Sequence, residues 1–268
     1  MSSDTLTAPT SASPTAKPDL SPRRAAWFAG LAYVALFVLA LFANFAVRER
    51  LVDLDDATAT AGNIAGSITT FRFAMLAFLV VFVLDVVVAW LLHVVFRPFG
   101  ERRSLLAAWF RLAYTVFLGV AIVFMFVAIR LIDGGPATAA IGTDQRAAHA
   151  TLALDAFNAT WMIGLVLFAL HLIVLGYIMW SSAVAPRWVA VAPIVAGAVY
   201  LIDSIGYTVL TDYAAHANVF TAIVVGPAIV SEGVLTVWLL QRGHAGRRPA
   251  RPTADFADPG RPTLPVGW

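Results

Sequence analysis

Residues 73–96 read FAMLAFLVVFVLDVVVAWLLHVVF, an apolar run that contains one carboxylate, Asp85, and one imidazole, His93. With a rise of about 1.5 Å per residue, a helix of this length spans about 36 Å, which exceeds the hydrocarbon core of a bilayer at about 30 Å. The run therefore predicts a transmembrane helix. A charge in hydrocarbon costs about 2.5–3.5 kcal/mol, so Asp85 requires a partner, a water-filled cavity or a functional reason.

Five other runs have the same apolar character, at residues 25–47, 105–129, 154–180, 189–210 and 219–240. Together the six runs predict an all-α membrane protein, a six-transmembrane-helix bundle that occupies residues 23–242. Residues 1–22 are rich in Ser, Thr, Pro and Ala, and residues 243–268 are rich in Gly, Arg and Pro. Both segments are predicted to be disordered tails.

Composition narrows the class of protein further. Hydrophobic residues make up 60% of the chain and charged residues 13%, against about 25% charged in an average soluble domain. The absence of cysteine excludes disulfides, thiolate metal sites and iron–sulfur clusters. Metalloprotease, phosphate-loop, dinucleotide and esterase motifs are missing, so we predict no cofactor and no metal. The sequence lacks a basic stripe interleaved with aromatic residues, so nucleic-acid binding is not predicted. The predicted partners are the lipid bilayer and a small molecule or ion.

The arginines are unevenly distributed between the two sides of the predicted bundle. Most lie in the tails and in the second and fourth loops, whereas the opposite side carries Arg48, Arg50, Arg130 and Arg146. Because positive charges are retained in the cytoplasm, both termini are predicted to be cytoplasmic. Lys17 is the only lysine among the 18 basic residues, and such a preference for arginine over lysine is typical of a GC-rich bacterial genome. We therefore expect a multi-pass protein of the bacterial cytoplasmic (inner) membrane.

Four ionisable residues are predicted to share one layer near the middle of the membrane. Asp85 and Glu232 each lie about 20 Å from the outer ends of their helices, and His171 lies about 15 Å from the inner end of its helix. Arg111 starts about 10 Å from the cytoplasmic side and reaches the same depth with its long side chain. We expect Arg111 to pair with Asp85 or Glu232, and these four residues are candidates for binding a ligand or ion.

A second group of polar residues is predicted nearer the outer surface. Its members are Asn44, Asn63, Arg72, Asp155, Asn158 and Asp203. Arg72 lies near a helix N-terminus, where the helix dipole repels a cation, so an anionic partner is expected, either Asp155 or Asp203. Alternatively, Arg72 extends to the lipid headgroups.

Several of these candidates also have a purely structural interpretation. Arg111 and its carboxylate can form an ion pair that only holds helices together. His171 can be a neutral core histidine bonded to a neighbouring carbonyl. Asp203 lies between Tyr200 and Tyr207 at helical spacing and can accept a hydrogen bond from a tyrosine hydroxyl.

Three classes of function remain open. A transport-like or small-ligand-binding bundle with a polar core is favoured, because polar groups occur at mid-membrane depth on at least four predicted spans. The first alternative is a non-catalytic membrane scaffold or sensor whose buried ion pairs are structural. The second is an intramembrane enzyme that acts on a lipid-like substrate with a carboxylate or His171 as general base. No catalytic residue is assigned, and binding is favoured over catalysis.

Five short motifs, taken in order, resemble the bacterial domain of unknown function 4386 family over residues 25–242. They are the loop from Asp56 to Arg72, Leu105 to Arg111, His171 to Tyr177 followed by Pro186-Arg187, Gly197 to Ser204, and Ser231-Glu232-Gly233. The resemblance implies a six-helix inner-membrane protein with no established activity. The recurring polar positions of the family correspond here to Asn63, Arg72, Arg111, His171, Asp203 and Glu232, and less closely to Asp85.

Overall fold

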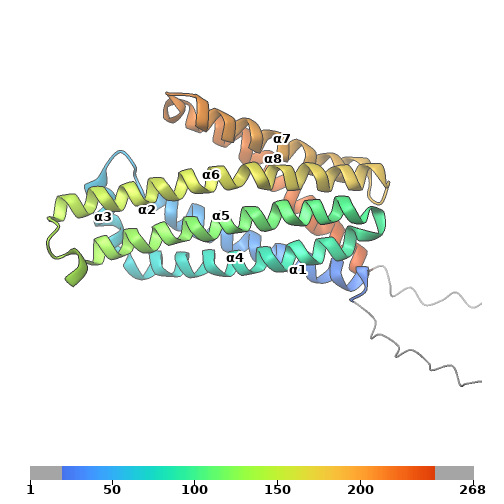
Figure 1. Cartoon of the computed structure of the whole chain (residues 1–268), viewed down its shortest axis with the longest axis horizontal. Helices are drawn as coiled ribbons and strands as arrows, with labels where there is room; N and C mark the ends of the chain where they lie inside the picture. The colour runs from blue at the N-terminus through green and yellow to red at the C-terminus, as the bar shows by residue number, and fades with distance from the viewer. Residues whose placement is uncertain (1–19, 245–268) are drawn as a thin grey trace, which may run out of the picture.

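The computed structural model of the chain describes residues 20–244, so the two predicted tails lie almost entirely outside the described residues. Within residues 20–244 the chain is helical and contains no strand (Figure 1). In chain order the elements are α1 (Pro22–Ala40), the π-helical η1 (Leu41–Arg48), α2 (Glu49–Leu51), α3 (Ala57–Gly66), α4 (Ile68–Phe96), η2 (Arg97–Phe99), α5 (Glu101–Asp133), η3 (Pro136–Thr138), α6 (Thr143–Ser181), α7 (Arg187–Val209) and α8 (Tyr213–His244).

Six helical segments in this part of the chain are long and apolar enough to cross a membrane. The predicted six-helix, all-α fold is confirmed, and it supports a multi-pass membrane protein. Most of the helices extend past the apolar runs from which they were predicted. The helix predicted over residues 154–180, for example, begins at Thr143, because the polar stretch before the run is also helical.

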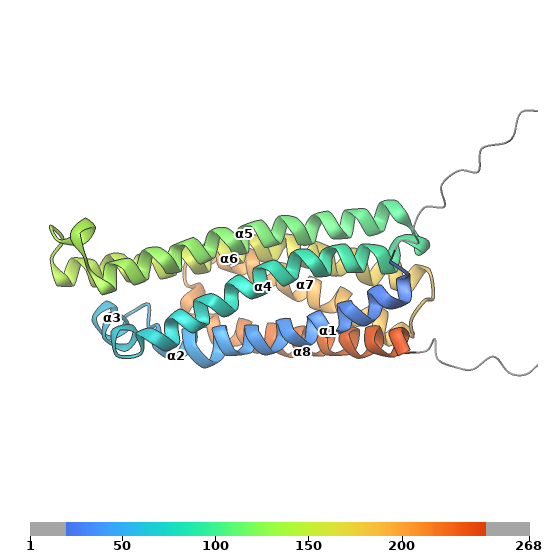
Figure 2. The ribbon, with the colours of Figure 1, turned by 90° about the horizontal axis from the view of Figure 1, so that it is seen from below.

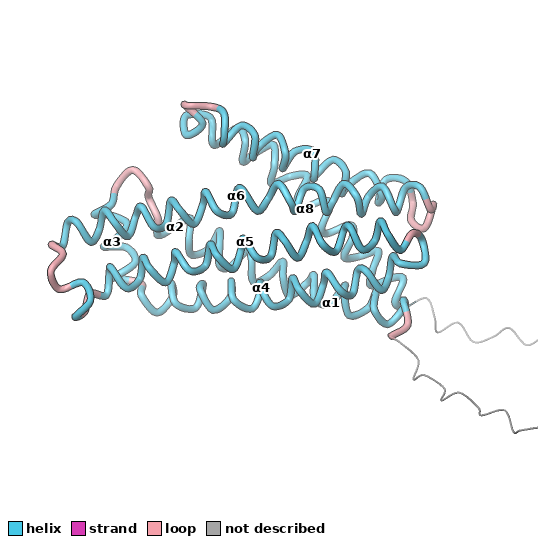
Figure 3. The backbone as a smooth tube through the Cα atoms, viewed as in Figure 1, coloured by secondary structure: helices cyan, strands magenta, loops and turns pink. Residues whose placement is uncertain are grey.

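The six long helices form a closed ring. α1 packs against α4, α4 against α5, α5 against α6, α6 against α7, α7 against α8, and α8 against α1. Both described ends of the chain lie at the same end of the bundle, which we call the terminal end, and the other end is the distal end (Figure 2). Short loops connect the helices (Figure 3). Towards the distal end, the α7–α8 hairpin leans away from the rest of the bundle (Figure 1).

Two glycines allow α6 and α7 to approach closely. A Cβ atom on Gly197 of α7 would lie 2.6 Å from the backbone oxygen of Ala169 on α6. A Cβ atom on Gly176 of α6 would lie 2.7 Å from the backbone oxygen of Ala190 on α7. Each helix therefore presents a glycine to the backbone of the other, as is common where small residues bring membrane helices together.

The substitution Gly197→Ala is expected to destabilise the protein by about 1–3 kcal/mol, because the new methyl group overpacks against a backbone oxygen that cannot move without shifting α6. Thermal unfolding of the detergent-solubilised protein measures this loss. Gly233→Ala is the matched control, since a Cβ at that helical position meets no atom within 4 Å. Equal unfolding temperatures for the two variants would contradict the close α6–α7 contact.

Candidate functional site

A buried ion pair joins α4 and α5 inside the bundle. Arg111 Nη2 donates to Asp85 Oδ1, and the two side chains are only 2% and 4% exposed. Arg111 Nη1 donates to the hydroxyl of Tyr33 on α1 at 2.8 Å. The guanidinium also lies 5.1 Å from the ring centroid of Tyr33 and 5.4 Å from that of Phe168. Of the two carboxylates expected to pair with Arg111, Asp85 is the one that does so.

His171 on α6 completes this group. Its Nδ1 lies 2.8 Å from the carbonyl oxygen of Ala107, and its Nε2 lies 3.4 Å from Arg111 Nη1. A carbonyl only accepts and a guanidinium only donates, so the proton resides on Nδ1 and Nε2 is the acceptor. These contacts fit a neutral imidazole with both nitrogens engaged. We call Tyr33, Asp85, Arg111 and His171 the Arg111 cluster; it joins α1, α4, α5 and α6.

Glu232 on α8 stands apart from the Arg111 cluster. Among the described residues, its carboxylate forms no hydrogen bond or ion pair; the nearby hydroxyl of Thr236 donates to the backbone oxygen of Glu232 instead, at 2.6 Å. Arg111 and Asp85 act on the Glu232 carboxylate only through longer-range electrostatics. Because Asp85 already neutralises Arg111, Glu232 is the carboxylate that remains without a partner.

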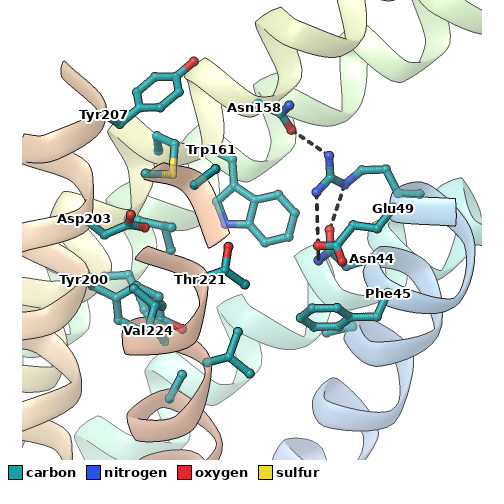
Figure 4. Close-up of a pocket in the computed structure, with 18 of the residues that line it drawn as sticks. Asn44, Phe45, Glu49, Asn158, Trp161, Tyr200, Asp203, Tyr207, Thr221 and Val224 are labelled. Atoms are coloured by element: carbon teal, nitrogen blue, oxygen red, sulfur yellow. Dashed lines mark hydrogen bonds and ion pairs between the residues drawn. The ribbon is translucent and has the colours of Figure 1, made fainter. Parts of the chain in front are cut away.

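The carboxylate of Glu232 borders a cavity of about 620 Å³. The cavity lies among α1 with η1, α6, α7 and α8 (Figure 4). It is on the side where the α7–α8 hairpin leans away from the bundle (Figure 1). It runs from Glu49 and Asp155 to Glu232, so it connects the predicted outer group of polar residues with the middle layer. Asn44, Asp155, Asn158, Asp203 and Glu232 line it, whereas Asp85, Arg111 and His171 do not.

Trp161 of α6 projects into the middle of this cavity (Figure 4). Its ring packs edge-on against Phe78 and Phe157, with centroids 5.6 and 5.4 Å away. The indole nitrogen is buried and has no hydrogen-bond partner. An indole N–H can only donate, and leaving a buried donor unsatisfied costs about 1–3 kcal/mol. This nitrogen is shielded from the cavity, so its missing bond is a cost of packing the ring into the wall and not a donor presented to a ligand.

Arg48 organises one wall of the cavity and was not among the predicted site residues. Its Nε donates to Asn44 Oδ1 at 2.7 Å, and its Nη1 donates to Asn158 Oδ1 at 2.7 Å. Glu49 lies 3.7 Å from Arg48 Nη2 and accepts from Asn44 Nδ2 at 2.9 Å. The sequence predicts Arg48 in an outer loop, because the apolar run ends at residue 47. The chain instead continues as the π-helix η1, a rare conformation that is frequent at functional sites.

A tyrosine bonds to Asp203, as one of the structural interpretations anticipated. The donor is the hydroxyl of Tyr213, which lies 2.7 Å from Asp203 Oδ1 and links the start of α8 to α7. The tyrosines considered from sequence were Tyr200 and Tyr207, which flank Asp203 on its own helix. The actual partner comes from the adjacent helix.

Two residues of the predicted outer group, Arg72 and Asn63, also lie outside the cavity. Arg72 forms an ion pair with Asp133 at 2.5 Å, and the two side chains are 61% and 37% exposed. The expected pairing of Arg72 with Asp155 or Asp203 is therefore wrong. The first turn of α4 lies beside the last turn of the antiparallel α5, which ends at Asp133. Asn63 is an exposed residue of α3 whose side chain donates to the Leu51 carbonyl at 3.4 Å.

Within residues 20–244, no three His, Asp or Glu side chains converge in a way that suits a metal ion. The arrangement instead separates two kinds of polar group. The charges of the Arg111 cluster pair with each other inside the bundle, although Arg111 Nε lacks a hydrogen-bond partner among the described residues. The cavity wall instead offers carboxylates to whatever enters.

Comparison with known proteins gives a family and one distant relative. The sequence profile of a domain of unknown function (DUF4386) matches residues 28–243. An uncharacterized protein of the archaeon Archaeoglobus fulgidus is 23% identical over 172 residues, which cover 64% of this chain and 85% of that protein. No solved structure matches the chain.

Proposed function

The chain belongs to the family of domain of unknown function 4386, and from its geometry we propose that it binds a small ligand within the membrane, in a transport-like manner. The observation that carries the proposal is a single cavity that reaches from the polar groups near the distal end to an unpaired carboxylate, Glu232, deep in the bundle. A volume of about 620 Å³ is in the range of small-molecule sites, which is about 300–1,000 Å³. Ionisable residues in membrane helices commonly mark pathways for ligands and ions.

The scaffold alternative accounts for the Arg111 cluster but leaves Glu232 unexplained. An ion pair that joins α4 to α5, with further bonds to α1 and α6, is suited to holding helices together. A carboxylate without a partner at the edge of a cavity adds nothing to such a framework and costs free energy to bury. We therefore assign the Arg111 cluster a structural role and the cavity the binding role.

The enzyme alternative is weakened by the position of His171. Both of its ring nitrogens are already engaged, one by the Ala107 carbonyl and the other by Arg111. The imidazole also does not line the cavity. A general base must lie within hydrogen-bond reach of the substrate proton, and His171 does not meet that requirement for a ligand in this cavity.

The proposal also includes the orientation. From the arginine distribution, the terminal end should face the cytoplasm of a bacterial cell and the distal end the outside. The cavity would then be entered from the outer half of the membrane, because its polar wall lies towards the distal end.

Cysteine labelling tests both the cavity and the orientation, and the natural chain is suitable because it contains no cysteine. Single substitutions Thr221→Cys and Ala228→Cys place a thiol at the cavity wall of α8. A membrane-impermeant thiosulfonate reagent is expected to modify both in sealed vesicles, and only when added from the distal side. Ile223→Cys and Val230→Cys are matched controls, because these α8 residues are 47% and 56% exposed on the surface of the bundle and do not line the cavity. They should remain unmodified in the membrane.

Unmodified thiols at both Thr221 and Ala228 would exclude a cavity open to water, and the proposed function would fail. Modification from the terminal side alone would reverse the entrance and contradict the proposed route of access.

A further inference from the structure

We infer that the ligand of this cavity is a monovalent organic cation with an apolar body, and that Glu232 is its counter-ion. The inference rests on the proposed function, because it names the chemical class that the proposed site accepts. It starts from the charges on the wall. Among the described residues that line the cavity there are four carboxylates and one guanidinium, from Glu49, Asp155, Asp203, Glu232 and Arg48.

The guanidinium of the wall is not free to meet an anion. Arg48 already donates to Asn44 and Asn158, and Glu49 lies 3.7 Å from its Nη2. Arg111 does not line the cavity, and its charge is paired with Asp85. An anionic ligand would therefore meet an excess of carboxylates without an available cation. A cationic ligand would meet a carboxylate without a partner.

Aromatic side chains flank Glu232 at the deep end of the cavity. Tyr114, Phe168 and Tyr200 all line this space. The ring centroids of Tyr114 and Phe168 are 4.9 Å apart, and those of Phe168 and Tyr200 are 5.7 Å apart, so the three rings form one continuous wall. Glu232 lines the same cavity as these three rings. An aromatic wall beside a carboxylate is suited to an ammonium or phosphonium group, because cations bind both carboxylates and the faces of aromatic rings.

An inorganic cation fits the site less well. Ca²⁺ and Mg²⁺ take about six or more oxygen ligands, whereas no three His, Asp or Glu side chains within residues 20–244 converge in a way that could hold a metal ion. Apolar side chains such as Phe37, Leu165 and Ile229 provide much of the remaining wall. They can bury a hydrocarbon or aromatic body, which a bare ion lacks.

The test uses three probes of similar shape and different charge: tetraphenylphosphonium, neutral triphenylphosphine oxide and the tetraphenylborate anion. The full chain carrying Thr221→Cys is reconstituted in lipid nanodiscs, and each probe is assayed for slowing the modification of this cavity thiol. Tetraphenylphosphonium is expected to protect at lower concentration than either of the other two probes. Nanodiscs without protein correct for partition of the probes into lipid.

The second arm of the test removes the counter-ion. Glu232→Gln keeps the shape of the side chain and is expected to weaken protection by tetraphenylphosphonium at least about tenfold, which corresponds to about 1.4 kcal/mol. Protection by triphenylphosphine oxide should change little. Glu101→Gln is the matched control, since it removes an exposed carboxylate outside the cavity. It should leave the protection by all three probes unchanged.

The outcomes separate the inference from the function on which it rests. The assignment of a cationic ligand is overturned if the neutral probe protects the thiol as well as the cation does. It is also overturned if Glu232→Gln does not weaken protection by the cation. In both cases a binding cavity remains. If none of the three probes protects the Thr221 thiol, the cavity does not bind molecules of this size, and both the proposed function and the ligand class fail.

Discussion

Replacing Arg111 with methionine is expected to destabilise the protein by about 3–5 kcal/mol, the cost of leaving one member of a buried ion pair without its partner. Asp85 would remain in the bundle with a 4% exposed side chain and no cation in contact. Tyr33 and His171 would each lose the donor that now binds them. The measurement is the unfolding temperature in detergent, together with the yield of monodisperse protein after extraction.

The control for this prediction removes both charges. In the double variant Asp85→Leu, Arg111→Met, neither member of the ion pair is left buried without its partner, and apolar residues of similar size often replace a buried ion pair without loss of stability. We expect this variant to recover most of the stability lost in Arg111→Met. It should also retain protection of the Thr221 thiol by tetraphenylphosphonium, because neither residue lines the cavity. A stable double variant without ligand protection would show that the Arg111 cluster takes part in binding.

The sequence was sufficient for the fold and for the depth of the buried charges. Six apolar runs predicted six helices, and the rise per residue placed Asp85 and Arg111 at one depth. The ion pair between Asp85 and Arg111 is consistent with that calculation. The same calculation also placed Glu232 at this depth, and the depth alone did not distinguish the two carboxylates. Asp85 on α4 faces Arg111 on the adjacent α5, whereas Glu232 on α8 faces the cavity.

The failed pairing of Arg72 has the same physical origin. Depth is fixed by position along a helix, but the partner of a side chain depends on which helices are neighbours and on which face each residue lies. In the closed ring, α4 neighbours α1 and α5, so Arg72 meets Asp133 at the end of α5. Asp155 and Asp203 belong to α6 and α7, on a different part of the ring. The order of the helices around the ring was not predictable from the apolar runs alone.

Arg48 was missed for a different reason. The end of the apolar run predicts the end of the helix, whereas helices in this chain continue well into polar sequence. The four-residue spacing of Asn44 and Arg48 was an available signal, because residues four apart lie on the same face of an α-helix. The wider turn of the π-helix η1 was not predictable from that spacing. It is within η1 that Arg48 and Asn44 bond to each other, while Arg48 also reaches Asn158 on α6.

The second large effect is expected for Arg48→Met, which should destabilise the protein by about 3 kcal/mol, because hydrogen bonds of charged groups contribute about 1.5–3 kcal/mol each. The substitution removes the bonds from Arg48 to Asn44 and Asn158, and with them the polar link between η1 and α6. Thermal unfolding measures the loss. Arg50→Met is the matched control, since Arg50 is an exposed arginine two residues further along the chain. A loss no larger than that of Arg50→Met would mean that the η1 contacts contribute little to the fold.

Arg48→Met also has an expected effect on binding, and its direction is opposite to that of Glu232→Gln. The variant removes the only guanidinium among the described residues of the cavity wall and leaves Glu49 without its cation. The wall becomes more negative, so tetraphenylphosphonium should protect the Thr221 thiol at lower concentration than in the parent protein. Weaker protection would have a different meaning, namely that Arg48 shapes the cavity more than it sets its charge. Comparing the two variants therefore separates the electrostatic attraction of the cavity from its geometry.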